Sequence, residues 1–336
     1  MDPVSQGLVG AAVPGSVSNK NELRLAVLVG FLSGLLADID VLIRSSQDPL
    51  LSIDYHRHFT HSLIIIPLGG LVAAGILWIF LRRRLDFGKI YIYATLGYAT
   101  HALLDACTNY GTSLLWPFSE IKVAWNIVSV IDPVFTLTLT VLLIIALLKK
   151  STFVIRMSLV FALLYLLLGY YQRERAEDYI LSVADERGHT VERVLVHPSI
   201  GNLVVWRSVY ESDGMYYTDA VRVGPLSGPM VYEGGSIEKF DVENTYPGLG
   251  KDTVLYKDIQ RFKHFSNGFL VIYPGYPNII GDLRYSILPN GVKPLWGIEV
   301  DIENENEHIE MADYERTVNG KDWRTFLAMI LGRPAF

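Results

Sequence analysis

Residues 61–84 read HSLIIIPLGGLVAAGILWIFLRRR, and this stretch decides the fold of the first half of the chain. Residues 64–81 carry no charged side chain, and their length is close to the roughly 20 apolar residues that a membrane-spanning helix needs. Arg82, Arg83 and Arg84 follow directly, and cationic clusters in short loops remain on the cytoplasmic side. His61 lies at the other end of the run. The sequence therefore predicts a metal-ligand side chain at the edge of a membrane helix.

Four more apolar segments could enter a membrane, residues 25–37, 90–107, 133–148 and 157–171. The composition agrees, because 50% of the 336 residues are hydrophobic, only 19% are charged, and the mean hydropathy is +0.28. We predict an α-helical membrane domain over residues 1–171, with about four or five membrane-embedded helices. The segment 25–37 is short for a span, so it either crosses the membrane or forms a buried, re-entrant helix.

After residue 171 the pattern becomes that of a β-rich extramembrane domain, residues 172–336, which an amphipathic helix at 172–188 links to the first domain. Alternation over residues 202–223 predicts a hairpin with Asp213-Gly214 at its turn, because glycine tolerates the positive φ of a tight hairpin. The remaining predictions are strands at 268–273, 283–288 and 297–302, a loop over 224–250 and a closing helix at 322–331.

The formal net charge of the chain is −6, and beyond residue 171 we count 17 Lys and Arg against 25 Asp and Glu. An acidic domain repels phosphates, so no nucleic-acid partner is expected. Cys107 is the only cysteine, which excludes an intrachain disulfide. The first residues lack the basic region and cleavage site of a signal peptide, so the internal apolar segments are expected to direct the chain to the membrane.

Lys149 and Lys150 follow the fourth apolar segment as the three arginines follow the second. If both loops are cytoplasmic, the alternation of spans puts the candidate site and the C-terminal domain on the extracytoplasmic side of the cytoplasmic, inner membrane.

Histidines and aspartates gather at the ends of the apolar segments. His101 and Asp105 are four residues apart in a helical segment, so they share one face and could bind one metal ion or bridge two. A histidine satisfied by a carboxylate neighbour is the alternative for this pair. Asp38 and Asp40 end an apolar helix, where acids oppose the helix dipole and repel each other unless a cation lies between them.

The segment HRHFTHS, residues 56–62, holds three imidazoles, which packing alone explains poorly. His56 and His61 are expected to bind a common metal centre if His56 lies in the loop before the helix. His58 is expected to be a solvated surface histidine. Thr60 is placed to cap the helix that follows.

Two further residues receive catalytic roles. Arg57 would hold a phosphate or another anionic group, or would pair with Asp54. Asp132, before Pro133, would act as a ligand or would orient a histidine.

The expected metal ligands are Asp38, Asp40, His56, His61, His101 and Asp105. Histidine and carboxylate without cysteine suit Zn²⁺, with Mn²⁺ or Fe²⁺ as alternatives. These are more ligands than one tetrahedral ion uses, so two or more divalent ions are expected, the usual equipment for activating water against a phosphoester.

These residues resemble the YdjM-like family of inner-membrane metal-dependent hydrolases, in its long form with a C-terminal β-rich domain. The matching pieces, in chain order, are MDPVSQGL (1–8), GAA (10–12), LADID (36–40), HRHFTHS (56–62), HALLD (101–105), YGT (110–112), WPFS (116–119) and IDP (131–133). Short members often have a histidine where Gln6 stands here. FSNG (265–268) and DLRY (282–285) are similar to the C-terminal domain of the longer members.

The resemblance implies a metal-dependent hydrolase of a bacterial or archaeal cytoplasmic membrane. A helical core with histidines and a His-x-x-x-Asp pair is also similar, as a fold-level analogy, to the zinc-dependent phospholipase C and nuclease superfamily.

Together these patterns predict a membrane hydrolase that acts on a lipid or lipid-linked phosphoester through metal-activated water. One rival is a metal-ion or proton transporter, which needs polar residues at several depths of the membrane. Another is a non-catalytic membrane scaffold with a structural metal, whose β domain binds a partner.

Overall fold

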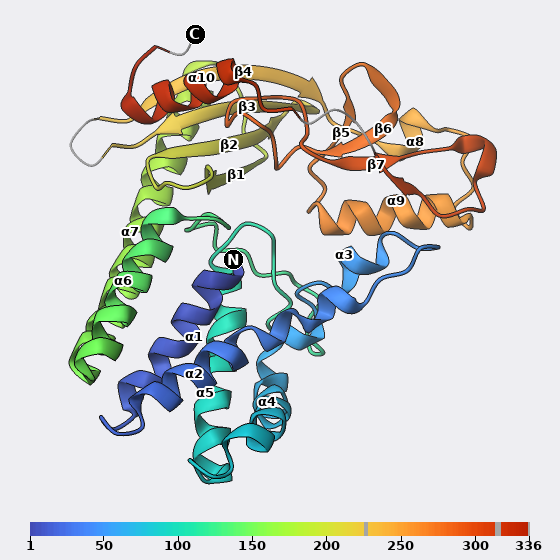
Figure 1. Ribbon diagram of the computed structural model, residues 1–336. Helices are drawn as coiled ribbons and strands as arrows, with labels where there is room; N and C mark the ends of the chain where they lie inside the picture. Colours follow the sequence, from blue (N-terminus) through green and yellow to red (C-terminus); the bar gives the residue numbers. More distant parts are fainter. Residues whose placement is uncertain (225–227, 313–316, 335–336) are drawn as a thin grey trace. The chain divides into compact units, whose positions relative to one another are not determined.

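The computed structural model describes residues 1–224, 228–312 and 317–334. The chain divides into two compact units (Figure 1). The helical unit comprises Met1–Leu42, Tyr55–Tyr171 and Ile200–Asn202, and the second unit comprises Ile43–Asp54, Gln172–Ser199 and Leu203–Phe336.

The helical unit is built from long helices joined by short helical turns. The long helices are α1 (Pro3–Val17), α2 (Leu23–Gly34), α4 (Ile66–Leu81), α5 (Phe87–Ala106), α6 (Pro133–Lys149) and α7 (Thr152–Glu186), the last of which continues into the second unit. The short elements are η1 (Leu36–Leu42), α3 (Leu51–Tyr55), η2 (Phe59–His61) and η3 (Leu63–Ile65). All five apolar segments expected from the sequence are therefore helical.

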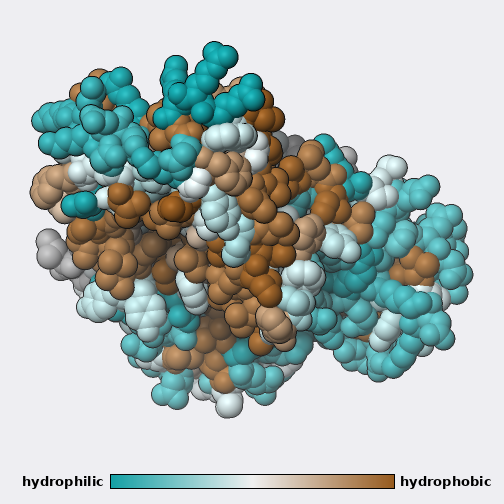
Figure 2. Space-filling view, turned by 90° about the horizontal axis from the view of Figure 1, so that it is seen from below, coloured by the Kyte–Doolittle hydropathy of each residue, from teal (hydrophilic) through white to brown (hydrophobic). Residues whose placement is uncertain are grey.

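Three helical segments of the described chain are long and apolar enough to cross a membrane, namely Leu23–Leu42, Leu63–Leu81 and Thr152–Glu186. α6 is a shorter apolar helix. Exposed hydrophobic side chains are frequent on these elements, with Phe80 76% and Leu148 74% exposed. Figure 2 shows hydrophobic side chains across a broad part of the visible face. Such a surface is expected of helices that face lipid.

α1 was not expected from the sequence, and close backbone contact explains how it forms. A Cβ atom at Gly10 would lie 2.7 Å from the carbonyl oxygen of Gly30 in α2, and one at Gly97 in α5 would lie 2.5 Å from the same oxygen. Small residues at such crossings let helix backbones approach closely. α1 carries Pro14 and three glycines, which are poor helix formers, so its helical state depends on packing against α2 and α5.

The second unit contains two four-stranded antiparallel sheets, with strand orders β1-β2-β3-β4 and β5-β6-β7-β8. The first sheet comprises β1 (Arg193–Pro198), β2 (Val205–Ser212), β3 (Met215–Arg222) and β4 (Met230–Glu238). The second comprises β5 (Leu270–Tyr273), β6 (Tyr276–Asp282), β7 (Gly297–Glu299) and β8 (Glu310–Met311). The helices of this unit are α8 (Val242–Thr245), α9 (Val254–Phe265) and α10 (Gly320–Leu331), with the short turn η4 (Ile302–Asn304).

Helices cover both sheets. Met329 of α10 packs in a cluster with Val205 and Ala220 of the first sheet. Phe262 and Phe265 of α9 meet the ring of Trp296 edge-on, just before β7. The expected β-rich domain is thus present, with helices on its sheets (Figure 1).

Several local predictions for this unit are confirmed. β2 and β3 form the expected hairpin, and both turn residues, Asp213 and Gly214, have positive φ (50° and 73°), as a tight two-residue turn requires. α7 runs without a break through the expected linking helix, and α10 occupies the expected closing helix.

Two other local predictions are wrong. The expected loop over 224–250 contains β4, whose Gly234 lies so close to the carbonyl oxygens of Thr218 and Asn290 that a Cβ atom would be 2.1 Å from each. Residues 283–288, expected to form a strand, have an irregular backbone, and the strand in this part of the chain is β6, which ends at Asp282. The buried guanidinium of Arg207 explains this, because it donates to the carbonyls of Leu283 and Pro289 at 2.7 and 2.8 Å and so replaces strand pairing.

Candidate metal centre

The candidate centre is assembled from three parts of the helical unit. Asp38 and Asp40 lie on η1, which continues from the apolar helix α2. His61 ends η2, and His101 and Asp105 lie one turn apart on α5. A left-handed residue, Arg57 with φ 59°, turns the chain between α3 and η2, and this turn lets both ends of the segment 56–61 approach η1.

Four ligand atoms converge in this centre: Oδ1 of Asp38, Nε2 of His61, Nε2 of His101 and Oδ2 of Asp105. Asp38 Oδ1 lies 3.6 Å from His61 Nε2 and 3.2 Å from His101 Nε2. Asp105 Oδ2 lies 3.3 Å and 3.7 Å from the same two nitrogens. Tetrahedral bonds of about 2.0–2.1 Å to zinc place ligand atoms about 3.3–3.4 Å apart, so the four separations fit one ion.

Two atoms of this group are buried and make no hydrogen bond within the described part of the chain, Nε2 of His61 and Oδ2 of Asp105. Asp105 Oδ2 is compensated by the guanidinium of Arg57, whose Nε lies 2.9 Å away. A buried ring nitrogen without a hydrogen bond is costly. Its position between two carboxylates fits a metal ligand.

The other ring nitrogen of each histidine is held, and this fixes the tautomer. His101 Nδ1 donates to the carbonyl oxygen of Gly34 at 2.5 Å, so its Nε2 carries the lone pair. His61 Nδ1 lies 2.9 Å from Oγ1 of Thr60 and 3.3 Å from Oδ2 of Asp40, and Thr60 in turn donates to that oxygen. Asp40 and the Gly34 carbonyl therefore act as the orienting partners that metal-bound histidines usually have.

A second group shares Asp38 with the first. It comprises Asp38, Asp40 and His56, with His56 Nδ1 3.0 Å from Asp40 Oδ1. His56 and Asp38 are 25% and 27% exposed, whereas Asp40 is buried. A carboxylate common to both groups can bridge two ions, and the second group is the one that solvent reaches.

Burial alone would lower the pKa of His61, but the neighbouring carboxylates of Asp105, Asp38 and Asp40 outweigh it and raise the pKa to about 10. The three carboxylates thus favour a positive charge at this point, which a proton or a metal ion would supply. A metal ion would have to displace the proton, because a ligating histidine is neutral.

Asp105 is the most constrained carboxylate of the centre. Its Oδ1 accepts hydrogen bonds from the amino group of Met1 and from Nε2 of Gln6, the latter at 2.7 Å. Arg57 pairs with its Oδ2 and also donates to Oγ1 of Thr108 at 2.8 Å. Within the described part of the chain, Arg57 pairs with Asp105, and Asp54, its expected alternative partner, pairs with Arg261 instead.

Residues 1–176, which include the whole candidate centre, match the family model described as YdjM inner membrane protein. The chain belongs to the YdjM family. An inner-membrane family and three apolar candidate spans together indicate a membrane protein.

Two curated relatives are similar over parts of their length. The uncharacterized protein YfhP of Bacillus subtilis (strain 168) is 28% identical over 40% of this chain and 42% of its own. The inner membrane protein YbcI of Escherichia coli (strain K12) is 28% identical over 31% of this chain and 61% of its own. The chain thus spans about two fifths and three fifths of these relatives. No solved structure matches it.

The YdjM match includes every residue of the centre. The structure brings together the six expected ligands Asp38, Asp40, His56, His61, His101 and Asp105 in two overlapping groups. Asp132 lies elsewhere: its Oδ1 accepts from the backbone of Val134 and Phe135 and caps α6, and Tyr165 donates to its Oδ2 at 2.7 Å. His58 also lies outside both groups, among the rings of Tyr55, Phe59 and Trp116.

Sequence reasoning missed three residues of this YdjM centre or gave them another role. Thr60 does not cap a long helix, because α4 begins only at Ile66, and it links Asp40 to His61 instead. Gln6 and Thr108 hold Asp105 and Arg57. The family resemblance drew attention to position 6, but no periodicity in the sequence indicates either contact.

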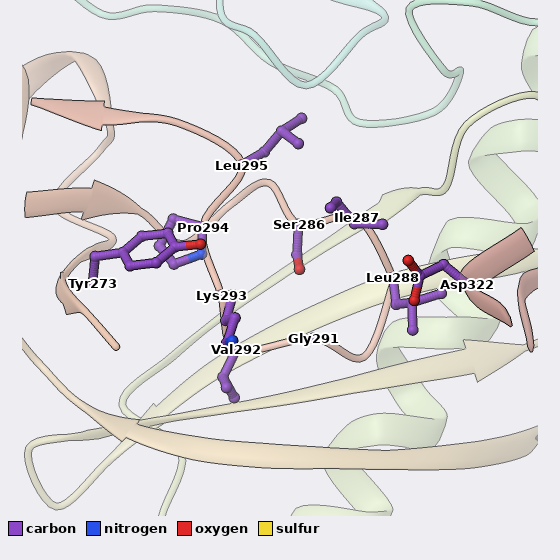
Figure 3. Close-up of a pocket in the computed structure, with 10 residues that line it drawn as sticks. All are labelled: Tyr273, Ser286, Ile287, Leu288, Gly291, Val292, Lys293, Pro294, Leu295 and Asp322. Carbon is purple, nitrogen blue, oxygen red and sulfur yellow. The ribbon is translucent and has the colours of Figure 1, made fainter. Parts of the chain in front are cut away.

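The second unit has a separate concave site, shown in Figure 3. It has a volume of about 340 Å³, and its charged lining residues are Lys293 and Asp322. Asp322 already forms the capping box of α10 with Asn319. None of the residues that line it is a candidate metal ligand.

Proposed function

We propose that this protein is a membrane-bound, metal-dependent hydrolase that cleaves a phosphoester in a lipid or lipid-linked substrate. The observation that carries the proposal is the pair of ligand groups that share Asp38. Divalent ions bound there would supply an activated water and would polarise a phosphoester oxygen. The chain itself must hold the ligands, admit the substrate and exclude bulk water from the buried half of the centre.

The residues are suited to these tasks. Asp40, through Thr60, and the carbonyl of Gly34 hold the rings of His61 and His101 with their Nε2 atoms toward the carboxylates, so that both nitrogens could bind an ion there. The histidines and carboxylates include no thiolate, which favours zinc, with manganese or iron as alternatives.

The two sides of the centre differ in access. His61, His101 and Asp105 are at most 1% exposed, whereas Asp38 and His56 are about a quarter exposed. The substrate would therefore approach from the side of Asp38 and His56. Arg57 is only 5% exposed and is already paired, so we assign it the positioning of Asp105 rather than contact with the anionic group.

An apolar groove between α2 and α4 supports a lipid as the substrate. It has a volume of about 360 Å³, and apart from Ser33 its lining is hydrophobic, including Leu28, Leu36 and Ala73. Both lining helices are candidate spans, so in a bilayer the groove would face the hydrocarbon. Leu36 precedes Asp38 by two residues on η1. An acyl chain in the groove would leave its head group near the exposed side of the centre.

The test compares metal content and turnover on the same samples of detergent-purified, full-length protein. His61→Gln and Asp105→Asn are expected to lose bound metal and hydrolysis of bis-p-nitrophenyl phosphate together while their thermal unfolding transition persists. Asp86→Asn is the matched control, because Asp86 caps α5 at an exposed position and asparagine caps equally well.

Each other outcome is informative. A folded wild-type protein without metal after incubation with Zn²⁺ and Mn²⁺ would refute the metal centre. Bound metal without turnover of this substrate or of phospholipid vesicles would favour a structural or transported ion.

A further inference from the structure

The segment Ile43–Asp54 groups with the second unit, although the chain on both sides of it belongs to the helical unit. Candidate ligands flank this segment: Asp40 precedes it and His56 follows it. Contacts that fix residues 43–54 therefore restrict the positions of Asp40 and His56, because only a few backbone bonds separate these two residues from the segment.

Arg261 of α9 contacts the segment through two of its carboxylates. The guanidinium of Arg261 contacts both oxygens of Asp48, with Nη1–Oδ1 and Nη2–Oδ2 distances of 3.1 and 3.0 Å. Its Nε and Nη2 lie 2.8 and 2.7 Å from Oδ2 of Asp54. Its Nη1 also donates to Oδ1 of Asp258, one turn earlier on α9, at 2.7 Å. We call these four residues the Arg261 cluster.

The cluster is anchored in the second unit. Asp258 is only 2% exposed, and its other oxygen accepts from His308 Nδ1 at 2.8 Å and from the backbone of Ile309 at 3.2 Å. A planar guanidinium that engages one carboxylate through two parallel bonds fixes direction as well as distance, which an ammonium cannot do. The cluster therefore sets the orientation of residues 48–54 relative to α9.

We propose that the Arg261 cluster is a positioning device by which the C-terminal unit sets the place of His56 and so controls the metal affinity of the group Asp38, Asp40 and His56. This inference rests on the proposed function. It assigns Arg261, which lies outside the family match, a role in the metal centre.

The two ligand groups should differ in how much they depend on the Arg261 cluster. His101 and Asp105 are fixed on α5, and His61 is fixed by Thr60 and Asp40, so the four-residue group has its own supports. His56 has one hydrogen-bonded partner in its group, Asp40, and stands two residues after Asp54. Loss of the Arg261 cluster should therefore weaken metal binding by the group Asp38, Asp40 and His56. Metal binding by the four-residue group should be unchanged.

The experiment titrates metal-free, full-length protein in detergent with Zn²⁺ and follows hydrogen exchange of residues 50–58 in the same samples. Arg261→Gln is expected to lower the affinity for the weaker ion by about tenfold or more, as loss of an orienting partner does. The affinity for the tighter ion should change less than about twofold, and exchange at residues 50–58 should be faster. Lys263→Gln is the control, because it removes one exposed positive charge from the same helix.

Asp54→Asn serves as the second variant, since it breaks one pair from the side of the segment and leaves α9 unchanged. If Arg261→Gln does not fold, the Zn²⁺ titration and the hydrogen exchange of Asp54→Asn test the inference instead. Unchanged affinity for the weaker ion, with unchanged exchange, overturns the inference.

Failure of the proposed function is distinguishable from failure of this inference. A wild-type protein that binds fewer than two ions contradicts the two-ion centre itself. In that case hydrogen exchange at residues 55–58 tests the role of the Arg261 cluster. Faster hydrogen exchange in both variants supports the cluster as a positioning device, and unchanged exchange refutes it.

Discussion

At the scale of single residues, the sequence predicted which residues form the two candidate ligand groups, but it did not predict the contacts that hold them. His101 and Asp105 could be placed on one face because a helix repeats every 3.6 residues. Thr60 and the Gly34 carbonyl reach their partners through tertiary folding, which no local pattern encodes. The same is true of Arg57, whose partner is Asp105 of α5 and not the nearby Asp54.

Thr60 offers a test of histidine orientation. In Thr60→Val the hydroxyl that links His61 Nδ1 to Asp40 is lost while the shape is kept. We expect Zn²⁺ affinity to fall by about 10–100-fold, measured by competition with a chelating dye. Thr140→Val, which removes a hydroxyl that bonds only within α6, is the control and should bind as the wild type does.

His197 of β1 should make stability depend on pH. Burial lowers its pKa to about 4, although the carbonyls of Pro198 and Arg284 contact its ring nitrogens. The unfolded chain takes up this proton near pH 6.5, so between these values the unfolded state binds more protons. The contribution of His197 is complete above pH 6.5 and falls by up to about 3 kcal/mol toward pH 4.

The measurement is the thermal unfolding midpoint of the full chain from about pH 7.5 to about pH 5. His197→Gln should flatten the decline at acid pH. An equal decline in both proteins would show that other groups cause it.

At the scale of elements, the length of the apolar runs predicted the long apolar helices, and alternation of residue types predicted the hairpin. The closing helix α10 was also predicted. Several elements, α9 among them, were not predicted, and two of these, α1 and β4, have sequences that are locally unfavourable. α1 is rich in glycine and is stabilised by close contact with α2 and α5, and β4 contains Gly234 where two carbonyls approach. In both cases a glycine that argues against the element is required by its neighbour.

The crossing of α1 and α2 should tolerate no added side chain. A Cβ at Gly30 would lie 2.3 Å from the carbonyl oxygen of Gly10, so Gly30→Ala is expected to lower the free energy of unfolding by about 1–3 kcal/mol. Gly75→Ala on α4 is the control, since nothing lies within 4 Å of its Cβ position. Chemical denaturation in detergent compares the two, and equal stability would contradict the close crossing.

The groove between α2 and α4 can be filled to test its role. Ala73→Phe should reduce hydrolysis of a long-chain phospholipid by about tenfold relative to bis-p-nitrophenyl phosphate, because only the lipid needs the groove. Ile79→Phe, at a 66% exposed position of the same helix outside the groove, should leave the ratio unchanged. A parallel loss on both substrates would remove the groove from the proposal.

At the scale of the whole molecule, the change from an apolar to a polar sequence after residue 171 predicted a helical region followed by a β-rich one. The sequence did not predict that residues 43–54 group with the second unit. Arg261, which lies more than 200 positions away in the chain, contacts Asp48 and Asp54 of that segment. Ion pairs at such separations leave no periodic signal.

Sidedness is the prediction that belongs to this scale. In a Cys107→Ala background, a membrane-impermeant maleimide added to intact cells should label Lys251→Cys, where the native side chain is 71% exposed, and should not label Arg83→Cys. The physical reason is that arginine clusters stay cytoplasmic. Labelling of Arg83→Cys alone would invert the proposed orientation. Labelling of both after permeabilisation is the control for reactivity.

The shared carboxylate of Asp38 links the proposed function to metal supply. One of its two ligand groups is enclosed and the other is reached by solvent through His56. If both bind ions, the enclosed ion should exchange slowly and the outer one quickly, and each ion should alter the charge that the other meets at Asp38. Turnover would then rise and fall with the free concentration of metal in the surrounding compartment. The enclosed ion would remain bound and keep the helical unit folded when that concentration is low.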